Sequence, residues 1–199
     1  MKHTKLALQV CLSVGVCMHA ALAQPAAPSD ASAAAGAAQP ADARPELNDA
    51  LPQGRRIGTG RLTVWGFQVY DARLWAQPGF SAASYDRAPL ALEVSYLRAF
   101  KAQEVAERSI KEIRRSKPVS DAQASRWIAD MLRVIPDVRK GDRVLGVHQP
   151  GVGAAFWVNG KNTGEVQDAE FARLFFGIWL SPNTSEPKLR EALLAGAAG

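Results

Sequence analysis

Few side chains in this chain are suited to acid–base, nucleophilic or metal chemistry. The sequence contains three histidines and two cysteines, and all of them except His148 fall within the first 19 residues. His148 is therefore the one candidate in the rest of the chain for a general acid or base that titrates near neutral pH. Four aspartates considered as catalytic residues or calcium ligands are spread along the sequence, which argues against two-carboxylate catalysis and a calcium loop: Asp71, Asp137, Asp142 and Asp168.

The N-terminal segment has the layout of a secretory signal peptide. Lys2 and Lys5 form a basic start, residues 6–16 are largely apolar, and small residues surround Ala23. The apolar run is shorter than the roughly 18 residues that a membrane-spanning helix needs. We expect residues 1–23 to be removed by cleavage after Ala23, which predicts a soluble protein in the periplasm or outside the cell.

A lipoprotein anchored through Cys11 or Cys17 is the alternative to cleavage after Ala23, although neither cysteine follows the small-residue pattern of a lipid-attachment site.

Removal of residues 1–23 changes the chemistry available to the remaining chain. Cleavage leaves no cysteine, which excludes disulfides and thiol catalysis. Loss of Lys2 and Lys5 lowers the net charge from +5 to +3, too small an excess to indicate nucleic-acid binding. We therefore expect no cofactor, no metal, no nucleic-acid partner and no integral membrane segment after cleavage.

Two further segments follow the predicted signal peptide. Residues 24–45 are rich in Ala, Pro, Ser and Gly, a composition typical of a disordered linker. Residues 46–199 are long enough to form one domain with its own core.

Hydrophobic periodicity predicts strands and helices in the first part of this domain. Alternation predicts strands over 61–64, 67–75 and 91–97, with Tyr70 and Leu74 on one face of the second strand and Arg73 on the other. Helical spacing predicts helices over 102–115 and 121–135, and Ser120 with Gln123 is a candidate capping box for the latter.

The later part of the domain returns to strands and ends in helices. Strands are predicted over 143–148, 154–158 and 164–166, and Asn159-Gly160 predicts a tight hairpin turn. Asp168 is expected to cap a very aromatic helix that ends before Pro182, and Thr184 or Ser185 to cap the final helix. The sum is an α+β fold.

Three segments together resemble the chalcone isomerase-like family, in particular its exported bacterial branch. They are GTGR (58–61) followed by GFQVYDARLWA (66–76), then LEVSYLRAFKAQEVAERSIKEI (92–113), then IPDVRKGD (135–142) running into the block 156–194. The resemblance covers residues 55–195. It implies an open-faced β-sandwich, in which a large antiparallel sheet is covered by a helical layer with an apolar cleft between them. Plant relatives cyclise chalcones to flavanones, and other relatives in plastids bind fatty acids.

The catalytic residues of the isomerase are largely replaced in this chain. Arg61 matches the arginine on the first strand of the isomerase. The positions of its tyrosine and asparagine correspond to Lys101 and Arg108, with Ser109 as the alternative for the latter, and a late threonine corresponds to Leu174. Chalcone cyclisation needs donors that polarise the enone carbonyl, and these replacements remove them.

Five residues are the candidates to bind an anionic ligand. A guanidinium offers a two-pronged fork to a carboxylate, which makes Arg61 the leading candidate. Tyr70 and Tyr96 are further candidates, and Lys101 and Arg108 are expected at the mouth of the cleft. Each has a structural alternative: an ion pair with a carboxylate for Arg61, core packing for the tyrosines, and a solvent-exposed helix surface for Lys101 and Arg108.

We therefore expect a non-catalytic periplasmic protein that binds a small apolar or fatty-acid-like anion between sheet and helices. The alternative is an intramolecular lyase or isomerase acting on a non-chalcone substrate through His148. A third possibility is a partner-binding surface at the basic end of the helix over 102–115: Lys111, Arg114, Arg115 and Lys117. The sequence leaves open whether the cleft is empty or filled by Phe171, Phe175 and Trp179.

Overall fold

The structure is a computed structural model that describes residues 44–198. The predicted signal peptide (1–23) and all but the last two residues of the predicted linker (24–45) lie outside the described residues. Arg44 and Pro45 belong to the fold, because Pro45 begins helix α1 (Pro45–Ala50) and the Arg44 guanidinium donates hydrogen bonds to the Glu93 carboxylate.

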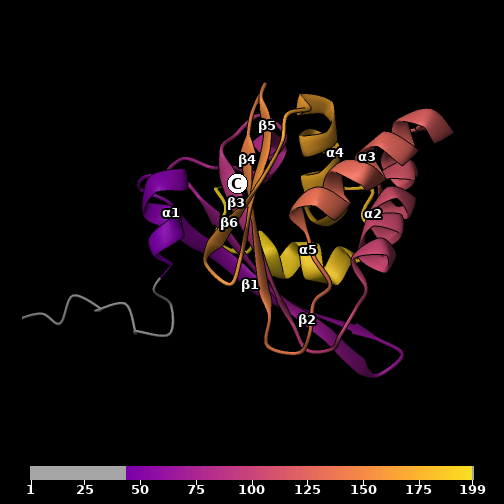
Figure 1. Ribbon diagram of the computed structural model, residues 1–199. Coiled ribbons are helices and arrows are strands. Elements are labelled where there is room, and N and C mark those ends of the chain that lie inside the picture. The colour runs from indigo at the N-terminus through magenta and orange to yellow at the C-terminus, as the bar shows by residue number, and fades with distance from the viewer. Residues whose placement is uncertain (1–43, 199) are drawn as a thin grey trace, which may run out of the picture. The chain divides into compact units, whose positions relative to one another are not determined.

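A single antiparallel sheet lies at the centre of the fold (Figure 1). Its strands are hydrogen-bonded in the order in which they occur in the sequence: β1 (Arg55–Val64), β2 (Phe67–Ala76), β3 (Leu90–Tyr96), β4 (Arg143–Gln149), β5 (Gly153–Val158) and β6 (Lys161–Val166). Two-residue turns join β1 to β2 and β5 to β6, whereas two helices separate β3 from β4.

Helices cover the two faces of the sheet unequally (Figure 1). Four helices form a layer on one face: α2 (Ala102–Ser116), α3 (Asp121–Val134), α4 (Ala169–Leu180) and α5 (Pro187–Leu193). The short helix α1 packs on the opposite face, where Leu47 and Leu51 meet Trp75 and Leu145. A 3₁₀ helix, η2 (Ala82–Ser84), lies between β2 and β3. The architecture is the open-faced α+β sandwich that the sequence predicts.

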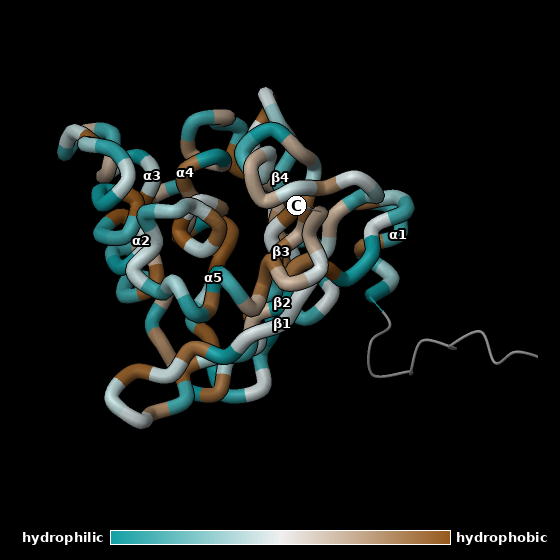
Figure 2. The backbone as a smooth tube through the Cα atoms, turned by 180° about the vertical axis from the view of Figure 1, so that it is seen from behind, coloured by the Kyte–Doolittle hydropathy of each residue, from teal (hydrophilic) through white to brown (hydrophobic). Residues whose placement is uncertain are grey.

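Helix α4 supplies much of the core between the sheet and the helical layer. Asp168 caps it as predicted, with its Oδ1 accepting a hydrogen bond of 2.9 Å from the Phe171 backbone N–H. Phe175 packs against Phe171 and Phe176, and it also meets Phe156 of β5 edge to face. Figure 2 shows hydrophobic residues concentrated along α4 and the strands that it faces.

Local signals in the sequence located most elements correctly. The predicted turn at Asn159-Gly160 is confirmed, with φ of 51° and 82° at these two residues. Ser120 caps α3 by accepting a hydrogen bond from the Gln123 N–H at 3.2 Å. On β2, Tyr70 and Leu74 face the main core and Arg73 faces the other side, as the alternation predicts.

Several elements differ from those predicted, and β6 begins at Lys161 rather than at residue 164. Strand β1 begins at Arg55 rather than at residue 61. The earlier start was missed because Gly58 and Gly60 interrupt the hydrophobic pattern of the strand. Glycine is needed at Gly58, where a Cβ would lie 2.3 Å from the Ala192 carbonyl oxygen on α5. Helix α1 was not predicted, and Glu186 rather than Thr184 or Ser185 precedes the first turn of α5.

An ionic cluster is buried on the face of the sheet that α1 covers. Glu93 of β3 is fully buried, and its carboxylate accepts hydrogen bonds from Arg44, from Arg73 at 2.8 Å and from Arg143 at 2.9 Å. Arg143 also pairs with Glu46 of α1. Burial alone would raise the pKa of Glu93, but the hydrogen bonds from Arg44 and Arg143 outweigh it and hold the pKa below its usual value. The cluster therefore fastens α1 to the sheet.

Candidate functional site

An apolar cavity lies between the sheet and the helices α2 and α4. Its volume is ≈ 540 Å³, within the range of pockets that bind small organic molecules. Apolar side chains from both layers form most of the wall: Leu62, Leu92, Val94, Val144 and Phe156 from the strands, and Val105, Phe175, Ile178 and Trp179 from the helices. The cleft is thus open, with Phe175 and Trp179 in its wall, while Phe171 lies in the core behind it.

The periodicity of each element explains which of its residues face the cavity. On β3, every second residue points the same way, so that Leu92, Val94 and Tyr96 all line the cavity. On α2, Arg108, Ser109 and Glu112 follow Val105 by three, four and seven residues and share one face of the helix with it. This face of α2 brings both charged and hydroxyl side chains to the cavity.

Two tyrosine hydroxyls mark a polar region within the cavity. Tyr70 and Tyr96 are cross-strand partners on β2 and β3, and their rings meet edge to face with centroids 6.3 Å apart. The Tyr70 oxygen accepts a hydrogen bond of 2.9 Å from Nε1 of Trp179. Within the described chain, the Tyr96 hydroxyl makes no hydrogen bond. Burial raises the pKa of both tyrosines, so both remain protonated and able to donate to a ligand.

A buried carboxylate lies beside this region on α2. Nη2 of Arg108 is 2.7 Å from Oε1 of Glu112, whose side chain is only 8% exposed, whereas that of Arg108 is 61% exposed. The charges of Glu186 and Arg108 both act on the Tyr70 hydroxyl, and they shift its pKa in opposite directions. Glu112 was not identified from the sequence, although its position between the buried Ser109 and Ile113 was a signal that it faces inward.

The structure brings three of the five predicted binding residues together at the cavity: Tyr70, Tyr96 and Arg108. Arg61 is placed elsewhere, in a polar groove along β1 and β2, where its guanidinium pairs with Asp71 through hydrogen bonds of 2.5 and 2.9 Å. Lys101 precedes the first turn of α2, and its Nζ is 2.7 Å from Oδ2 of Asp137 on the surface. As placed, neither Arg61 nor Lys101 lines the cavity.

His148, on which the enzymatic alternative depends, lies in the core outside the cavity wall. Its side chain is 2% exposed, its ring packs against Phe176, and its Nδ1 is 3.1 Å from the Ala88 carbonyl oxygen. Burial lowers the pKa of His148, so the neutral form predominates at neutral pH. This position gives His148 no contact with a molecule in the cavity.

The basic end of α2 is largely engaged within the chain. Arg114 lies 2.6 Å from the Asp121 carboxylate, and Lys117 pairs with Glu170 of α4. Residues 44–198 contain no group of three or more His, Cys, Asp or Glu side chains placed to hold a metal ion. In the same part of the chain, each helix is too short or too polar to cross a bilayer.

Comparisons with known proteins agree on one family. The model of a family described as chalcone isomerase-like matches residues 57–195. An uncharacterized protein of Haemophilus influenzae is 32% identical over 138 residues, which are 69% of this chain and 66% of that protein. This chain thus spans about two thirds of the length of the curated relative it matches.

A solved structure supports the same fold. The crystal structure of a fatty-acid binding protein of Arabidopsis thaliana superposes with a TM-score of 0.56 over 73% of this chain and 89% of that one, at 12% sequence identity. At this identity the likeness shows the fold alone. The family match covers β1 from residue 57, the other five strands and α2 to α5, and leaves out α1. The chain therefore belongs to the chalcone isomerase-like family.

Proposed function

We propose that this protein binds a small apolar molecule with an acidic end, such as a fatty acid, in the cavity between sheet and helices, and does not transform it. The observation that carries the proposal is a cavity of ≈ 540 Å³ whose apolar walls enclose the Tyr70 and Tyr96 hydroxyls on one side. The Arabidopsis fatty-acid binding protein of the same fold supports the choice of ligand class.

Burial of an acyl chain would provide most of the affinity. Each methylene taken from water into an apolar site contributes about 0.8 kcal/mol, so a chain of about ten methylenes contributes about 8 kcal/mol before the cost of ordering it. Flat or branched apolar ligands of similar volume would gain comparably. The polar region therefore selects for the acidic end more than it determines the affinity.

The tyrosine hydroxyls and Arg108 are the groups that we expect to contact the acidic end. The Tyr96 hydroxyl has no hydrogen-bond acceptor among residues 44–198, and the Tyr70 hydroxyl receives a bond from Trp179 while its own proton remains available. The Arg108 side chain is 61% exposed, and its remaining guanidinium N–H groups can donate to a ligand carboxylate while Nη2 stays paired with Glu112. Arg61 lies in the groove along β1 and β2, outside the cavity, and is expected not to take part.

The absence of catalysis and the export of the protein are parts of the proposal that rest on separate observations. His148 packs against Phe176 rather than in the cavity wall, which supports binding without turnover. The layout of residues 1–23 supports export and cleavage after Ala23. Fractionation of cells expressing the chain with a C-terminal tag, followed by N-terminal sequencing, tests export. A tagged protein that stays in the cytoplasm and keeps Met1 would contradict it.

Titration of the purified protein with a fluorescent fatty acid, displaced by unlabelled palmitate, tests binding. Tyr96→Phe removes only a hydroxyl without a partner in the described chain, so we expect an unchanged melting temperature and about fivefold weaker binding, near 1 kcal/mol. Arg108→Gln should weaken palmitate binding about tenfold but leave binding of the matching alcohol unchanged. Arg61→Gln is the matched control, with one arginine lost outside the cavity.

Two outcomes would overturn this assignment in different ways. Loss of affinity in Arg61→Gln but not in Arg108→Gln would move the acidic end of the ligand to the groove along β1 and β2. If palmitate displaces the fluorescent fatty acid neither from the wild type nor from any variant, the ligand class is wrong. Native mass spectra of the protein before and after organic extraction would then identify any other apolar molecule that co-purifies.

A further inference from the structure

The tip of the β1–β2 hairpin exposes two aromatic side chains. Trp65 is 94% exposed and Phe67 is 60% exposed. The structure describes only two other large hydrophobic residues as exposed, Leu132 and Val152, and both are smaller. An isolated exposed apolar side chain is ordinary, but two adjacent exposed aromatics at the end of a projecting hairpin indicate a contact surface.

The turn geometry does not explain why a tryptophan stands at this tip. Trp65 and Gly66 form a two-residue turn with φ of 49° and 81°, a conformation that strains a bulky residue. The chain builds the same turn between β5 and β6 from Asn159 and Gly160, with φ of 51° and 82°. Asparagine tolerates this conformation far better than tryptophan. Trp65 is thus unfavourable both in its backbone conformation and in its exposure, and such a residue is a candidate for function.

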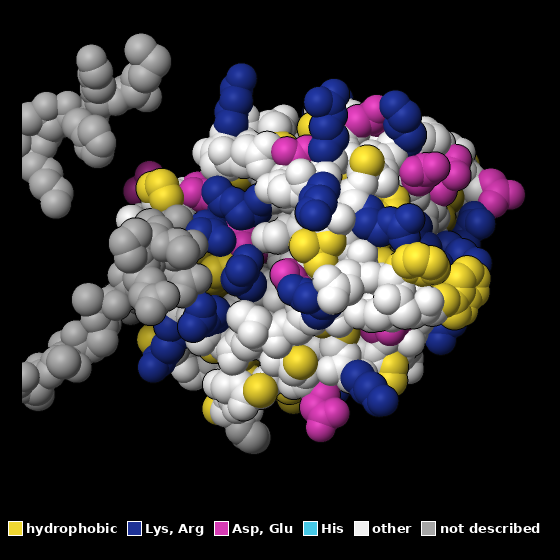
Figure 3. All heavy atoms as spheres, turned by 90° about the horizontal axis from the view of Figure 1, so that it is seen from below, with side chains coloured by type: hydrophobic (Ala, Val, Ile, Leu, Met, Phe, Trp, Pro, Cys, Tyr) yellow, Lys and Arg dark blue, Asp and Glu magenta, His cyan; other side chains and the backbone are white. Residues whose placement is uncertain are grey.

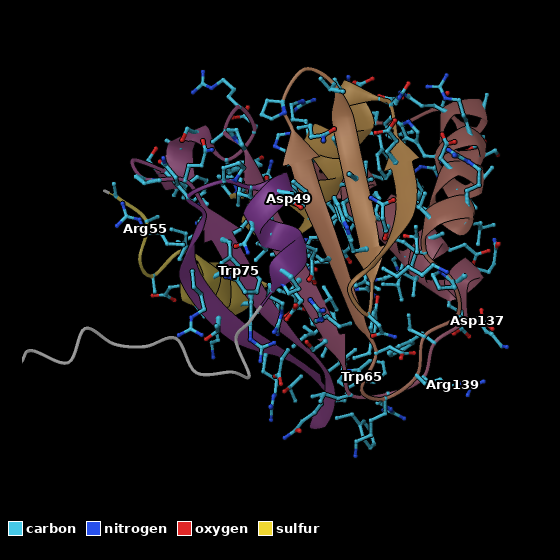
Figure 4. The ribbon with its side chains drawn as sticks, turned by 60° about the vertical axis from the view of Figure 1, so that its left-hand side comes forward. Asp49, Arg55, Trp65, Trp75, Asp137 and Arg139 are labelled. Atoms are coloured by element: carbon cyan, nitrogen blue, oxygen red, sulfur yellow. The ribbon has the colours of Figure 1, made fainter. Side chains whose placement is uncertain are left out.

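Basic side chains that form no hydrogen bond or salt bridge within residues 44–198 lie at the same end of the molecule. The Arg98 guanidinium carbon is 5.1 Å from the centre of the Phe67 ring. The side chains of Arg98, Arg139 and Lys140 form no hydrogen bond or salt bridge with any residue in 44–198. Figure 4 places Trp65 and Arg139 at this end, and Figure 3, which views the end directly, shows Lys and Arg side chains distributed over it.

The carboxylates near these cations are already hydrogen-bonded within the chain. Asp137 pairs with Lys101, and Asp142 accepts hydrogen bonds from the Asn159 side chain and the Arg139 backbone N–H. These bonds hold the pKa of both aspartates below its usual value. The Arg139 charge acts on both aspartates, whereas Arg98 and Lys140 remain available to an external anionic surface.

The hairpin tip is also the rim of the cavity, which Val64, Trp65, Phe67 and Arg98 help to line. We infer that this tip docks on an anionic phospholipid bilayer, with Trp65 and Phe67 in the interface and Arg98 and Lys140 against the headgroups. Tryptophan favours the boundary between headgroups and acyl chains, and basic residues are attracted to anionic lipids. Docking in this orientation would set the mouth of the cavity on the membrane, where an apolar ligand can pass without crossing water.

Vesicle binding by the purified protein tests this inference without any cavity ligand. We expect the wild-type protein to co-sediment with vesicles of mixed phosphatidylcholine and phosphatidylglycerol, and far less with pure phosphatidylcholine. Trp65→Asn creates the favoured Asn-Gly turn, so the melting temperature should stay equal or rise while vesicle binding falls about tenfold. Trp65→Gly, which also suits a positive φ, provides a second variant. Arg98→Gln combined with Lys140→Gln should remove the preference for anionic vesicles.

Val152→Asn is the matched control, because Val152 is 56% exposed in the turn between β4 and β5, at the opposite end of the sheet. This variant should bind vesicles as the wild type does. Equal binding by wild type, Trp65→Asn and Trp65→Gly, or no binding of the wild type to either vesicle, would overturn the inference. Fatty-acid titration is a separate measurement, so failure of one proposal is distinguishable from failure of the other.

Discussion

The indole N–H of Trp179 donates a hydrogen bond of 2.9 Å to the hydroxyl of Tyr70, and this contact joins helix α4 to strand β2 across one wall of the cavity. The two residues are 109 positions apart in the sequence. Tyr70 also packs edge to face on Tyr96, so the same contact connects the helical layer to the tyrosine pair that we propose as the polar end of the site.

Tyr70→Phe should destabilise the protein and weaken ligand binding together. The substitution keeps the ring but leaves the Trp179 N–H without its acceptor, which costs about 1–3 kcal/mol if no water replaces it. Urea unfolding of Tyr70→Phe, Trp179→Phe and the double variant measures the coupling between them. Additive effects of the two single substitutions would show that the hydrogen bond contributes nothing. Tyr96→Phe serves as the control, since its hydroxyl has no partner within residues 44–198.

Glu93→Gln should be among the most destabilising single substitutions on the sheet. It removes the carboxylate that Arg44, Arg73 and Arg143 share, and loss of one partner of a buried ion pair typically costs roughly 3–5 kcal/mol. Equilibrium unfolding in urea measures this cost. Asp71→Asn, which removes a carboxylate from the exposed pair with Arg61, is the comparison. An equal loss of unfolding free energy in the two variants would show that burial does not make the Glu93 cluster more important.

The same carboxylate should make the protein sensitive to acid. The pKa of Glu93 is lowered in the folded state, so its contribution to stability is complete above the unfolded pKa of about 4.3 and is lost as pH falls through the folded value. Urea midpoints measured between neutral pH and about pH 3 should fall less steeply in Glu93→Gln than in the wild type. Parallel curves for the two proteins would show that other carboxylates govern acid unfolding.

His148 should produce a second pH dependence nearer neutrality. Burial lowers its folded pKa below the unfolded value of about 6.5, so unfolded chains take up a proton first as pH falls. Its contribution to stability is complete above about pH 6.5 and declines as pH falls toward the folded pKa. His148→Leu should flatten the unfolding free energy in this window, whereas Glu93→Gln should leave the slope there unchanged. Retention of the full slope in His148→Leu would refute the assignment.

Asp168→Ala should lower the free energy of unfolding by more than the loss of an ordinary helix cap does. One carboxylate oxygen accepts from the Phe171 backbone N–H and the other from Nε1 of Trp127, each at 2.9 Å, and Trp127 is fully buried. Loss of a cap costs about 1 kcal/mol, and a stranded buried N–H adds about 1–3 kcal/mol. Thermal and urea unfolding measure the sum. Ser120→Ala, which removes only the cap of α3, provides the comparison, and an equal loss in both variants would show that the Trp127 bond is unimportant.

Several parts of the fold were predictable because neighbouring residues determine them. Asn159-Gly160 specifies a turn with two positive φ angles, Asp168 specifies a helix start, and alternation along β2 specifies which side chains enter the core. Helix α1 escaped prediction because six residues carry little periodicity, and its position depends on an ionic cluster with partners as far as 97 residues away. The start of β1 was missed for a related reason. Gly58 and Gly60 weaken the strand pattern in the sequence, and the α5 residues that a Cβ there would meet are distant in the chain.

The candidate site was also predictable only in part. Sequence reasoning correctly placed Tyr70 and Arg73 on opposite faces of their strand, and family resemblance indicated a cleft between sheet and helices. It did not reveal that Asp71 holds Arg61, that Glu112 is buried beside Arg108, or that Trp179 reaches Tyr70. Local chemistry determined the strands, turns and caps, because those signals act over a few residues. Only the tertiary structure decided which charges are paired and where the cavity opens, because those depend on contacts between residues distant in the sequence.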